Sequence, residues 1–537
     1  MPDVTARTPE PVALPRIRVG DTGDEAYAHP GATPLAAREG NRAAVAELLD
    51  HLGIFCFAVP GRSDHGTVLG VAAEDRTRVL EALARCLAHS PGHVTWLQES
   101  PVRTPRPRPS TDPRAWQGPA DAVGVQVSWY RTDPGGHLLL GHEYGCAVEF
   151  WNRQGDRLVA PRANRGAWSV AAAGPNVWGA ARLFTRFASD HTPADVAPPL
   201  ATRPEFLVPG IEDIDFPVDA VYTWVDGDDP AWQARKAAAK GEAYHAESAS
   251  QARFLSRDEL RYSLRSLHLF APWIRNVHVV TDDQVPGWMR TDVPGFHVVP
   301  HREIFRNPAD LPTFNSHAIE SQLHHIDGLA EHFLYFNDDM FLGRPVTPHA
   351  FFTPVGAARY FPSPNRIPQG PVAETDTPVD AACKNNRALL AGRFGRVITQ
   401  PMEHIPYALR RSAMAEAEAE FPEAWARTAA SRFRAMTDLS PTSSFALYYA
   451  ALTGRAQPGS LRFAYLRLSS ADLADRLDKL LEGRDHDSFC LNDTFSTVED
   501  VEAQQELLDR FLGSYFPTPS PCEHTGEERV PWPNPIP

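Results

Sequence analysis

The sequence has few cysteines, no long apolar run and no excess of basic charge. Its six cysteines are widely scattered, without a CxxC pair or the Cys/His spacing of a zinc site, so buried free thiols are the better interpretation. Nowhere do about 18 uncharged apolar residues run together, and the N-terminus lacks a signal-peptide core. The sequence therefore predicts a cytoplasmic protein without a transmembrane segment. It leaves a peripheral contact with the inner face of the membrane open.

The charge balance is acidic, with a formal net charge of −15 and a pI near 5.8. A nucleic-acid partner is normally signalled by a basic face or stripe, so this balance argues against one. A phosphate-binding site would then have to rest on a few basic residues gathered at one place in an otherwise acidic protein. At 537 residues and 43% hydrophobic content, the chain exceeds what one core usually organises, and two main units are expected.

The first part of the chain predicts a tail followed by a small module. Residues 1–30 are rich in proline, charge and small residues, so we expect them to be disordered. Residues 31–205 alternate helical spacing with strand-like runs, which predicts an α+β accessory module of open role. His65 and Glu149 could belong to a second site there. Polar residues near strand ends are commonplace, however, and a structural role is the simpler interpretation.

From residue 215 the pattern becomes an alternation of strands and helices. Strand-like runs are separated by helical spacing, for instance over 257–270 and 317–329. This alternation predicts an open, mostly parallel α/β sheet, which binds ligands at the carboxyl ends of its strands. Three of the predicted strand ends carry acids, namely Asp226, Asp282 and Asp339.

The last third of the chain reads mostly helical, and helices are expected over 413–421, 423–434, 443–452 and 501–512. The proline-rich end, 517–537, predicts an extended tail. The expected fold class is therefore α/β, with a mostly parallel sheet core and a helical C-terminal part within residues 215–516. A smaller α+β module precedes it.

Two Asn-Asp turns are candidates for metal binding. Asn337, Asp338 and Asp339 directly follow an apolar strand, and their hard oxygen atoms suit magnesium or manganese. Asn492 and Asp493 repeat the pattern and could complete a metal shell begun by Asp339. For both turns the alternative is a purely structural Asx-turn, because Asn and Asp are common turn formers.

A second group of candidates surrounds His404. This histidine precedes Ile405-Pro406, which predicts an extended turn rather than a helix, and it could deprotonate a hydroxyl near neutral pH. Arg432 and Arg434 could bind phosphate oxygens, or they could cover a helix surface with their stems. Taken singly, most of the 21 histidines would have a structural role.

Together these signals resemble the Stealth family, which includes bacterial capsule phosphotransferases and the animal GlcNAc-1-phosphotransferase of lysosomal enzymes. Four blocks occur in the family order across roughly residues 215–500. They are IDFPVDAVYTWVDGDD, then RFLSRDELRYSLRSLHLFAPWIRNVHVVTDDQVPGW with PTFNSHAIESQLHHIDGLAEHFLYFNDDMFLG, then the region of His404 and Arg434, then SFCLNDT. Four ordered blocks of this length are a very specific signal.

The resemblance implies a GT-A-like nucleotide-sugar core, a divalent cation (Mg²⁺ or Mn²⁺), a UDP-sugar donor and a glycan acceptor. It implies that His404 is the catalytic histidine, that Arg434 steadies the transferring phosphoryl group, and that Asp339 binds the metal with Asp493 and Asp338. The substrate-pocket residues that it implies are Trp224, Asp226, Arg261, Asp282, Glu320 and Asn492. For Arg261 the alternative is an exposed helix-surface pair with Asp258, three residues earlier.

The implied reaction transfers a hexose 1-phosphate, such as GlcNAc-1-phosphate, to a glycan hydroxyl and releases UMP, as in capsular or cell-surface polysaccharide synthesis. Two alternatives stay open. A metal-dependent GT-A glycosyltransferase would use the same acids but release UDP. An inactive glycan-binding protein would bind the donor without turning it over, although the joint presence of His404, Arg434, Asp339 and Asp493 disfavours it.

Overall fold

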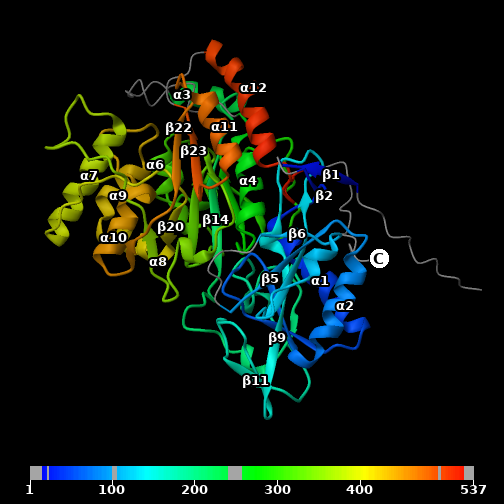
Figure 1. Ribbon diagram of the computed structural model, residues 1–537. Helices are drawn as coiled ribbons and strands as arrows, with labels where there is room; N and C mark the ends of the chain where they lie inside the picture. The colour runs from blue at the N-terminus through cyan, green and yellow to red at the C-terminus, as the bar shows by residue number, and fades with distance from the viewer. Residues whose placement is uncertain (1–14, 21–22, 100–105, 240–256, 494–497, 525–537) are drawn as a thin grey trace, which may run out of the picture. The chain divides into compact units, whose positions relative to one another are not determined.

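The structure, a computed structural model, describes residues 15–20, 23–99, 106–239, 257–493 and 498–524. It divides into two compact units, which Figure 1 colours along the chain from blue to red. The first unit holds the described residues up to Gly210 and the short piece Pro517–Pro519. The second holds Ile211–Phe516 and Ser520–His524. In the described part of the chain, no helix is both long and apolar enough to span a bilayer.

The first unit is built on a large mixed sheet. Its strand order is β12 (Val177–Gly179), β13 (Leu200–Thr202), β3 (Cys56–Val59), β4 (Thr67–Ala72), β9 (Cys146–Gln154), β7 (Gly124–Trp129), β5 (Gly92–Leu97) and β6 (Arg108–Pro109). Strand β9 also pairs with β10 (Arg157–Val159), which pairs with β11 (Ser169–Ala171). Strand β4 pairs with β9 in parallel, whereas β7 pairs with β9 in the antiparallel direction. The apolar residues of this sheet form the main core of the unit.

Two helices, α1 (Pro34–His51) and α2 (Arg76–Leu87), pack their apolar residues into this core. Helix α1 begins at a good cap, because the Thr33 hydroxyl accepts a hydrogen bond from the Ala36 N–H. Its buried Asn41 donates to the Tyr144 carbonyl at 2.9 Å and accepts from the Trp129 N–H at 3.2 Å. One polar side chain thereby ties the helix to the end of β7 and to the 3-10 turn His142–Tyr144, and it satisfies a buried backbone group in each.

The expectation that residues 1–30 are disordered is wrong for residues 16–19 and 24–28. Strands β1 (Arg16–Val19) and β2 (Asp24–Ala28) form an antiparallel pair, and β2 also pairs with β8 (Arg131–Thr132). The Tyr27 N–H donates to the Tyr130 carbonyl at 2.9 Å, and Ala26 and Tyr27 are buried. Composition averaged over 30 residues hid this short pairing segment. Residues 1–14 lie outside the described residues.

The second unit contains the mostly parallel α/β sheet that the sequence predicts. Its order is β16 (Phe296–Pro300), β15 (Val277–Thr281), β14 (Val218–Thr223), β17 (His332–Asn337) and β20 (Tyr407–Arg410). The first four strands are parallel and β20 runs antiparallel to β17. Strands β14 and β17 are buried almost throughout, as central strands covered on both faces are.

Helices and two small sheets surround this core. The helices are α3 (Pro230–Ala239), α4 (Glu259–Phe270), α5 (His301–Ile304), α6 (Ser316–Glu320), α7 (Pro378–Phe394), α8 (Arg411–Glu420), α9 (Pro422–Ala429), α10 (Ala446–Leu452), α11 (Leu473–Gly483) and α12 (Val498–Tyr515). The small sheets are β18 (Met340–Leu342), β23 (Ser488–Asn492) and β22 (Phe463–Arg467), and β19 (Ala358–Tyr360) with β21 (Ala456–Pro458). Figure 1 shows α7, α9 and α10 grouped together, and α11 and α12 beside β22 and β23.

Two helices end earlier than the sequence predicts. The helix expected over 317–329 is the short α6 followed by a 3-10 turn, Leu323–His325, and the Trp425 indole N–H donates to the Ser321 carbonyl at 2.8 Å. The helix expected over 423–434 ends at Ala429, and beyond its end the Phe314 N–H donates to the Arg432 carbonyl at 2.7 Å. Tertiary partners thus bind the backbone at and after these helix ends.

The expectation of an extended tail from residue 517 is wrong for the described part, which ends at residue 524. The Glu523 side chain is 2% exposed and accepts hydrogen bonds from Arg261 Nε at 2.6 Å and from Arg265 Nη2 at 2.7 Å, both on α4. The two guanidinium groups compensate the buried charge of the Glu523 carboxylate and hold this segment against α4. The proline-rich composition of the segment gives no sign of this contact. Residues 525–537 lie outside the described residues.

The buried carboxylate of Asp219 ties the amino-terminal ends of three parallel strands together. It accepts hydrogen bonds from Arg275 Nε at 2.8 Å and Nη2 at 2.6 Å, and from the backbone N–H groups of Asn276 and Ala330. Burial by itself raises the pKa of Asp219, but the Arg275 guanidinium and the other donors lower this pKa to about 2. The charged carboxylate is therefore the form that stabilises the fold.

We predict that Asp219→Asn lowers the free energy of unfolding by about 2–4 kcal/mol near neutral pH. The folded-state pKa lies below the unfolded value of about 4, so this contribution is present above pH ~4 and is lost as the pH falls toward ~2. The difference between the wild type and Asp219→Asn in urea unfolding should shrink over that range. Asp292→Asn, which removes an exposed partner of Arg290, is the matched control and should change little. Equal effects of the two variants would contradict this role.

Candidate functional site

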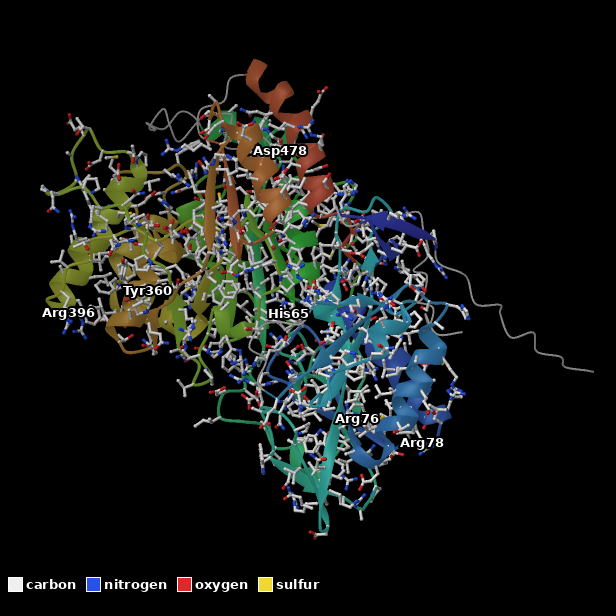
Figure 2. The ribbon with its side chains drawn as sticks, in the orientation of Figure 1. His65, Arg76, Arg78, Tyr360, Arg396 and Asp478 are labelled. Atoms are coloured by element: carbon white, nitrogen blue, oxygen red, sulfur yellow. The ribbon has the colours of Figure 1, made fainter. Side chains whose placement is uncertain are left out.

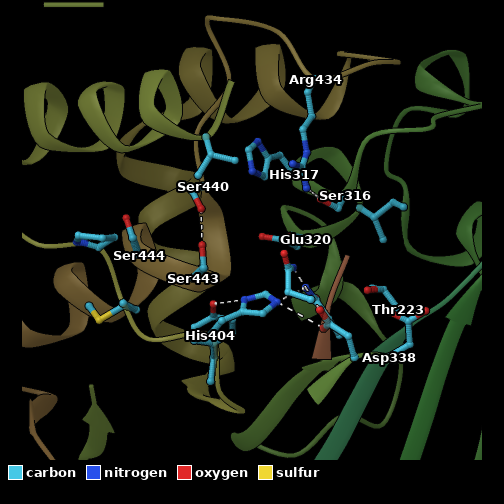
Figure 3. A pocket seen from close by; sticks show the side chains of 18 of the residues that line it. Thr223, Ser316, His317, Glu320, Asp338, His404, Arg434, Ser440, Ser443 and Ser444 are labelled. Carbon is cyan, nitrogen blue, oxygen red and sulfur yellow. Dashed lines mark hydrogen bonds and ion pairs between the residues drawn. The ribbon is translucent and has the colours of Figure 1, made fainter. Parts of the chain in front are cut away.

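A cavity of about 900 Å³ lies at the carboxyl ends of the central parallel strands of the second unit. Thr223 ends β14 and Asn337 ends β17, and both line the cavity with the residues that follow them. The opposite wall comes from α6 and from the segments around residues 401–407 and 434–444. This is where open α/β sheets bind ligands, because strand-end loops converge there. Figure 3 shows the cavity from close by.

Carboxylates crowd one end of the cavity. Asp338 and Asp339 form the turn from β17 into β18, and β18 pairs with β23 so that Met340 faces Cys490. Burial, together with the neighbouring carboxylates of Glu259 and Asp339, raises the pKa of Asp338 well above its usual range. Burial also raises the pKa of Glu259 to about 7. The acidic side chains at this end of the cavity are thus not fully neutralised by basic groups of the protein.

His404 faces these acids from the segment before β20. Its Nε2 lies 3.3 Å from Asp339 Oδ1, and its Nδ1 lies 3.2 Å from the Tyr407 hydroxyl oxygen. Burial lowers the pKa of His404, but the Asp339 carboxylate outweighs burial and leaves this pKa above the ordinary value. The same pair lowers the pKa of Asp339 in spite of its burial. The imidazole is therefore placed to accept a proton and to hold it beside a carboxylate.

Arg434 occupies the other end of the cavity. Its Nη2 donates to the Ser316 hydroxyl at 2.7 Å, which orients the guanidinium fork. In Figure 3, Glu320 lies between this pair and the end that carries His404 and Asp338. The Glu320 carboxylate accepts from the Thr442 hydroxyl at 2.6 Å, and burial raises its pKa. A ligand that spans the cavity from Asp338 to Arg434 would contact acidic side chains at one end and a guanidinium group at the other.

The donor atoms at the acidic end fit a hard divalent cation. Asp339 Oδ1 has His404 Nε2 beside it at 3.3 Å, and Asn492 Nδ2 donates to Asp339 Oδ2 at 3.5 Å. Carboxylate and amide oxygens from Asp338, Asp339 and Asn492 suit Mg²⁺ or Mn²⁺. The nearby Cys490 thiol does not suit them, since burial and Asp339 raise its pKa well above the usual range and keep it protonated.

Asp493 also lines the cavity, but its carboxylate has another partner. Arg257 Nη2 donates to Asp493 Oδ2 at 2.7 Å, and both side chains are largely buried. One carboxylate oxygen thus neutralises a buried arginine. A role for Asp493 in metal binding would have to use its other oxygen or displace Arg257.

The remaining sequence-predicted residues divide into two groups. Trp224 and Glu320 line the cavity with Asp338, Asp339, His404, Arg434, Asn492 and Asp493. Asp226, Asp282 and Arg261 do not line it. Arg235 Nη2 binds the Asp282 carboxylate at 2.8 Å. Arg261 pairs with Glu523, so it has neither the predicted place in the pocket nor the alternative exposed pairing with Asp258. The Asp226 carboxylate accepts from the Asp228 N–H in a local turn.

Several lining residues escaped sequence reasoning, namely Ser316, His317, Asn365, Ser440, Ser443 and Arg467. Ser440 and Ser443 share a hydrogen bond between their hydroxyl groups (Figure 3). Arg467 ends β22, a strand that the sequence pattern did not reveal and that pairs in parallel with β23. The one sequence signal for any of these residues was the hydroxyl-rich run after Pro441, and such a run is equally typical of the start of a helix.

The first unit places His65 and Glu149 in different surroundings. His65, labelled in Figure 2, comes between β3 and β4, and its ring packs edge-on against Phe187 at a centroid distance of 5.1 Å. Glu149 lies in β9, 3.6 Å from Arg162, and burial raises its pKa to about 7. These contacts are of the kind that support a core.

The chain matches four family models, each described as a conserved region of Stealth proteins. They are conserved region 1 over residues 216–244, region 2 over 253–360, region 3 over 403–451 and region 4 over 478–531. Relatives match nearly the whole chain. An exopolysaccharide phosphotransferase of Streptomyces coelicolor is 73% identical over 515 residues, which is 96% of this chain and 95% of the relative.

The chain belongs to the Stealth family of phosphotransferases. A second Streptomyces coelicolor exopolysaccharide phosphotransferase is 50% identical over 500 residues, covering 93% of this chain and 84% of the relative. The exopolysaccharide phosphotransferase CpsY of Mycobacterium tuberculosis is 35% identical over 528 residues, covering 96% and 93%. These matches extend through the first unit, which the four Stealth regions do not cover.

In this Stealth protein, Asn315 positions the segment that carries Arg434. This buried side chain donates to the Ser431 carbonyl at 3.0 Å and to the Asp438 carboxylate at 2.8 Å, and it accepts from the His317 N–H at the start of α6. It thereby joins the residue 431–438 loop to the helix that bears Ser316 and Glu320. Both partners of the Arg434–Ser316 contact depend on it.

We predict that Asn315→Ala lowers the free energy of unfolding by roughly 2–3 kcal/mol, because it removes a helix cap and leaves buried polar groups unsatisfied. Urea unfolding measures the effect. The matched control is Asn307→Ala, which removes an exposed side chain that accepts from the Ala309 N–H, and it should cost less than about 1 kcal/mol. An Asn315→Ala protein as stable as the control would show that the loop is held by other contacts.

Proposed function

We propose that this Stealth protein transfers a sugar 1-phosphate from a UDP-sugar, UDP-GlcNAc being the first donor to test, to a glycan hydroxyl in exopolysaccharide synthesis. The observation that carries the proposal is the cavity of about 900 Å³, which has the His404–Asp339 pair at one end and Arg434 at the other. The names of the relatives, exopolysaccharide phosphotransferases, support the same chemistry. We further propose a GT-A type core, supported by four parallel strands that end in an acidic turn.

In the proposed reaction, the oxygen of the acceptor hydroxyl attacks the β-phosphorus of the donor. The bond from that phosphorus to the oxygen bridging the α- and β-phosphates breaks, UMP leaves, and the sugar keeps its phosphate in a phosphodiester. The hydroxyl proton passes to His404 Nε2, and the Asp339 carboxylate beside it stabilises the imidazolium that forms. Positioning and charge stabilisation are the main tasks of the protein in such a transfer.

Arg434 meets the transferring phosphoryl group in this proposal. Its planar fork matches two phosphoryl oxygens, and the hydrogen bond to Ser316 sets the plane of the fork. A divalent cation bound by Asp338, Asp339 and Asn492 would supply positive charge for the diphosphate of the donor. Glu320 lies between the two ends, and burial raises its pKa, which disfavours a negative charge beside the diphosphate.

The released nucleotide tests the reaction type. With UDP-GlcNAc, a glycan acceptor and Mg²⁺ or Mn²⁺, the full-length protein should release UMP in step with acceptor modification. Chelation with EDTA should stop release, and adding back Mg²⁺ or Mn²⁺ should restore it, because the acidic end of the cavity needs a cation to receive a diphosphate. Release of UDP would assign a glycosyltransferase. Donor binding without turnover would assign an inactive binding protein.

Substitutions at the two ends of the cavity test the residue roles. His404→Ala should lower kcat by about 10²–10⁴-fold while donor affinity, measured by calorimetry, changes little. Arg434→Lys should also lower turnover, because lysine keeps the charge and loses the fork. Its matched control is Arg432→Lys, two residues away and outside the cavity lining.

If both residues only support the local fold, donor affinity, melting temperature and rate should fall together. Near wild-type turnover in a folded His404→Ala protein would remove this histidine from the mechanism. Equal rates for Arg434→Lys and Arg432→Lys would likewise remove the arginine fork.

A further inference from the structure

A cluster of two histidines and a glutamate lies in the second unit, away from the residues that line the 900 Å³ cavity. His324 and His325 come from the 3-10 turn after α6, and Glu418 comes from α8. His324 Nε2 lies 2.8 Å from Glu418 Oε2, and His325 Nε2 lies 3.0 Å from the same oxygen. Three ligand atoms, one from each residue, lie within 4.8 Å of one another.

Both ring nitrogens of His325 face oxygens that only accept hydrogen bonds. Its Nδ1 lies 3.1 Å from the Ile304 carbonyl oxygen, and its Nε2 lies 3.0 Å from Glu418 Oε2. An imidazole that gives its N–H to the Ile304 carbonyl through Nδ1 turns the Nε2 lone pair toward Glu418. In that tautomer, a metal ion beside Nε2 and Glu418 would bind both the lone pair and the carboxylate.

We propose that His324, His325 and Glu418 bind a zinc ion. Two imidazole nitrogens and one carboxylate oxygen form a ligand set that Zn²⁺ takes in proteins, with a fourth position left for water. The Ile304 carbonyl fixes the tautomer of His325 by accepting its Nδ1–H, as the outer partners of metal-bound histidines commonly do.

The surroundings of the cluster suit a bound ion that solvent can reach. His324 is 2% exposed and packs edge-on against the Trp425 ring at a centroid distance of 6.1 Å, which limits its rotation. A second cavity of about 360 Å³ borders His324 and His325 and gives water access to the fourth position. It shares no lining residue with the larger cavity, so this site goes beyond the proposed function.

Two arginines lie near the cluster, and neither occupies the ligand position. Arg306 Nη1 is 3.8 Å from Glu418 Oε1, but its side chain is 69% exposed and its charge is screened by solvent. Arg411 is occupied by backbone, since its Nε donates to the His324 carbonyl and its Nη1 to the Leu329 carbonyl. The ion would join the turn at His324 to α8, two elements that the chain separates by 94 residues.

Zinc content tests the site directly. Full-length protein freed of metal, incubated with Zn²⁺ and desalted, should retain one zinc more than His325→Ala or Glu418→Gln by elemental analysis. His404→Ala and His297→Ala, a change at an exposed histidine of β16, are the matched controls and should retain wild-type zinc from this cluster. Zn²⁺ should raise the melting temperature of the wild type and not that of His325→Ala.

Two outcomes would overturn the proposal. Equal zinc content in the wild type and a folded His325→Ala protein would place the ion elsewhere. No zinc retained by the wild type would show that the cluster holds no ion and that its three side chains only bind one another. If Glu418→Gln does not fold, His325→Gln gives the same comparison from the other partner of the pair. Failure here leaves the phosphotransferase proposal untouched, because the two sites share no residue.

Discussion

The antiparallel pairing of β20 with β17 is the constraint on which the candidate site depends. Tyr407 pairs with Tyr335, so the segment before Tyr407 runs past the end of β17, where Asp339 lies. This register brings His404 to within 3.3 Å of a carboxylate that is 65 residues earlier in the chain. Strand β23 closes the other side through its pairing with β18, which places Asn492 near Asp339. Backbone hydrogen bonds, rather than side-chain contacts alone, thus fix the positions of His404, Asp339 and Asn492.

The position of Arg434 depends on helices that stop short. Residues around 423–434 have the spacing of a helix, yet the helix ends at Ala429, and beyond it Asn315 and Phe314 donate to the carbonyl groups of Ser431 and Arg432. The same segment of chain then begins α6, whose first residue, Ser316, orients the guanidinium. Local helical preference yields here to a tertiary hydrogen-bond network, as it commonly does where a functional side chain must leave a helix surface.

The sequence predicted those features that depend on local pattern. An apolar strand followed by Asn-Asp-Asp led to Asp338 and Asp339, and the alternation of strands and helices led to the parallel sheet. It failed where a distant partner decides the outcome. Asp282 follows a strand just as Asp339 does, but Arg235 binds it, and Arg261 is held by Glu523, 262 residues away. Arg467 was missed because its strand, β22, exists only through pairing with β23. The spacing of residues along the sequence does not predict these ion pairs and strand pairings between distant segments.

The central claim is that phosphorus, and not the anomeric carbon of the sugar, is attacked. A donor labelled with a heavy oxygen isotope at the bridge between the anomeric carbon and the β-phosphorus separates the two cases. Mass spectrometry of the acceptor product and of the released nucleotide locates the label. The account predicts that the label stays with the sugar in the new phosphodiester and that the released nucleotide is unlabelled UMP. Label in released UDP would contradict it, because the bond from the sugar to that oxygen would then have broken.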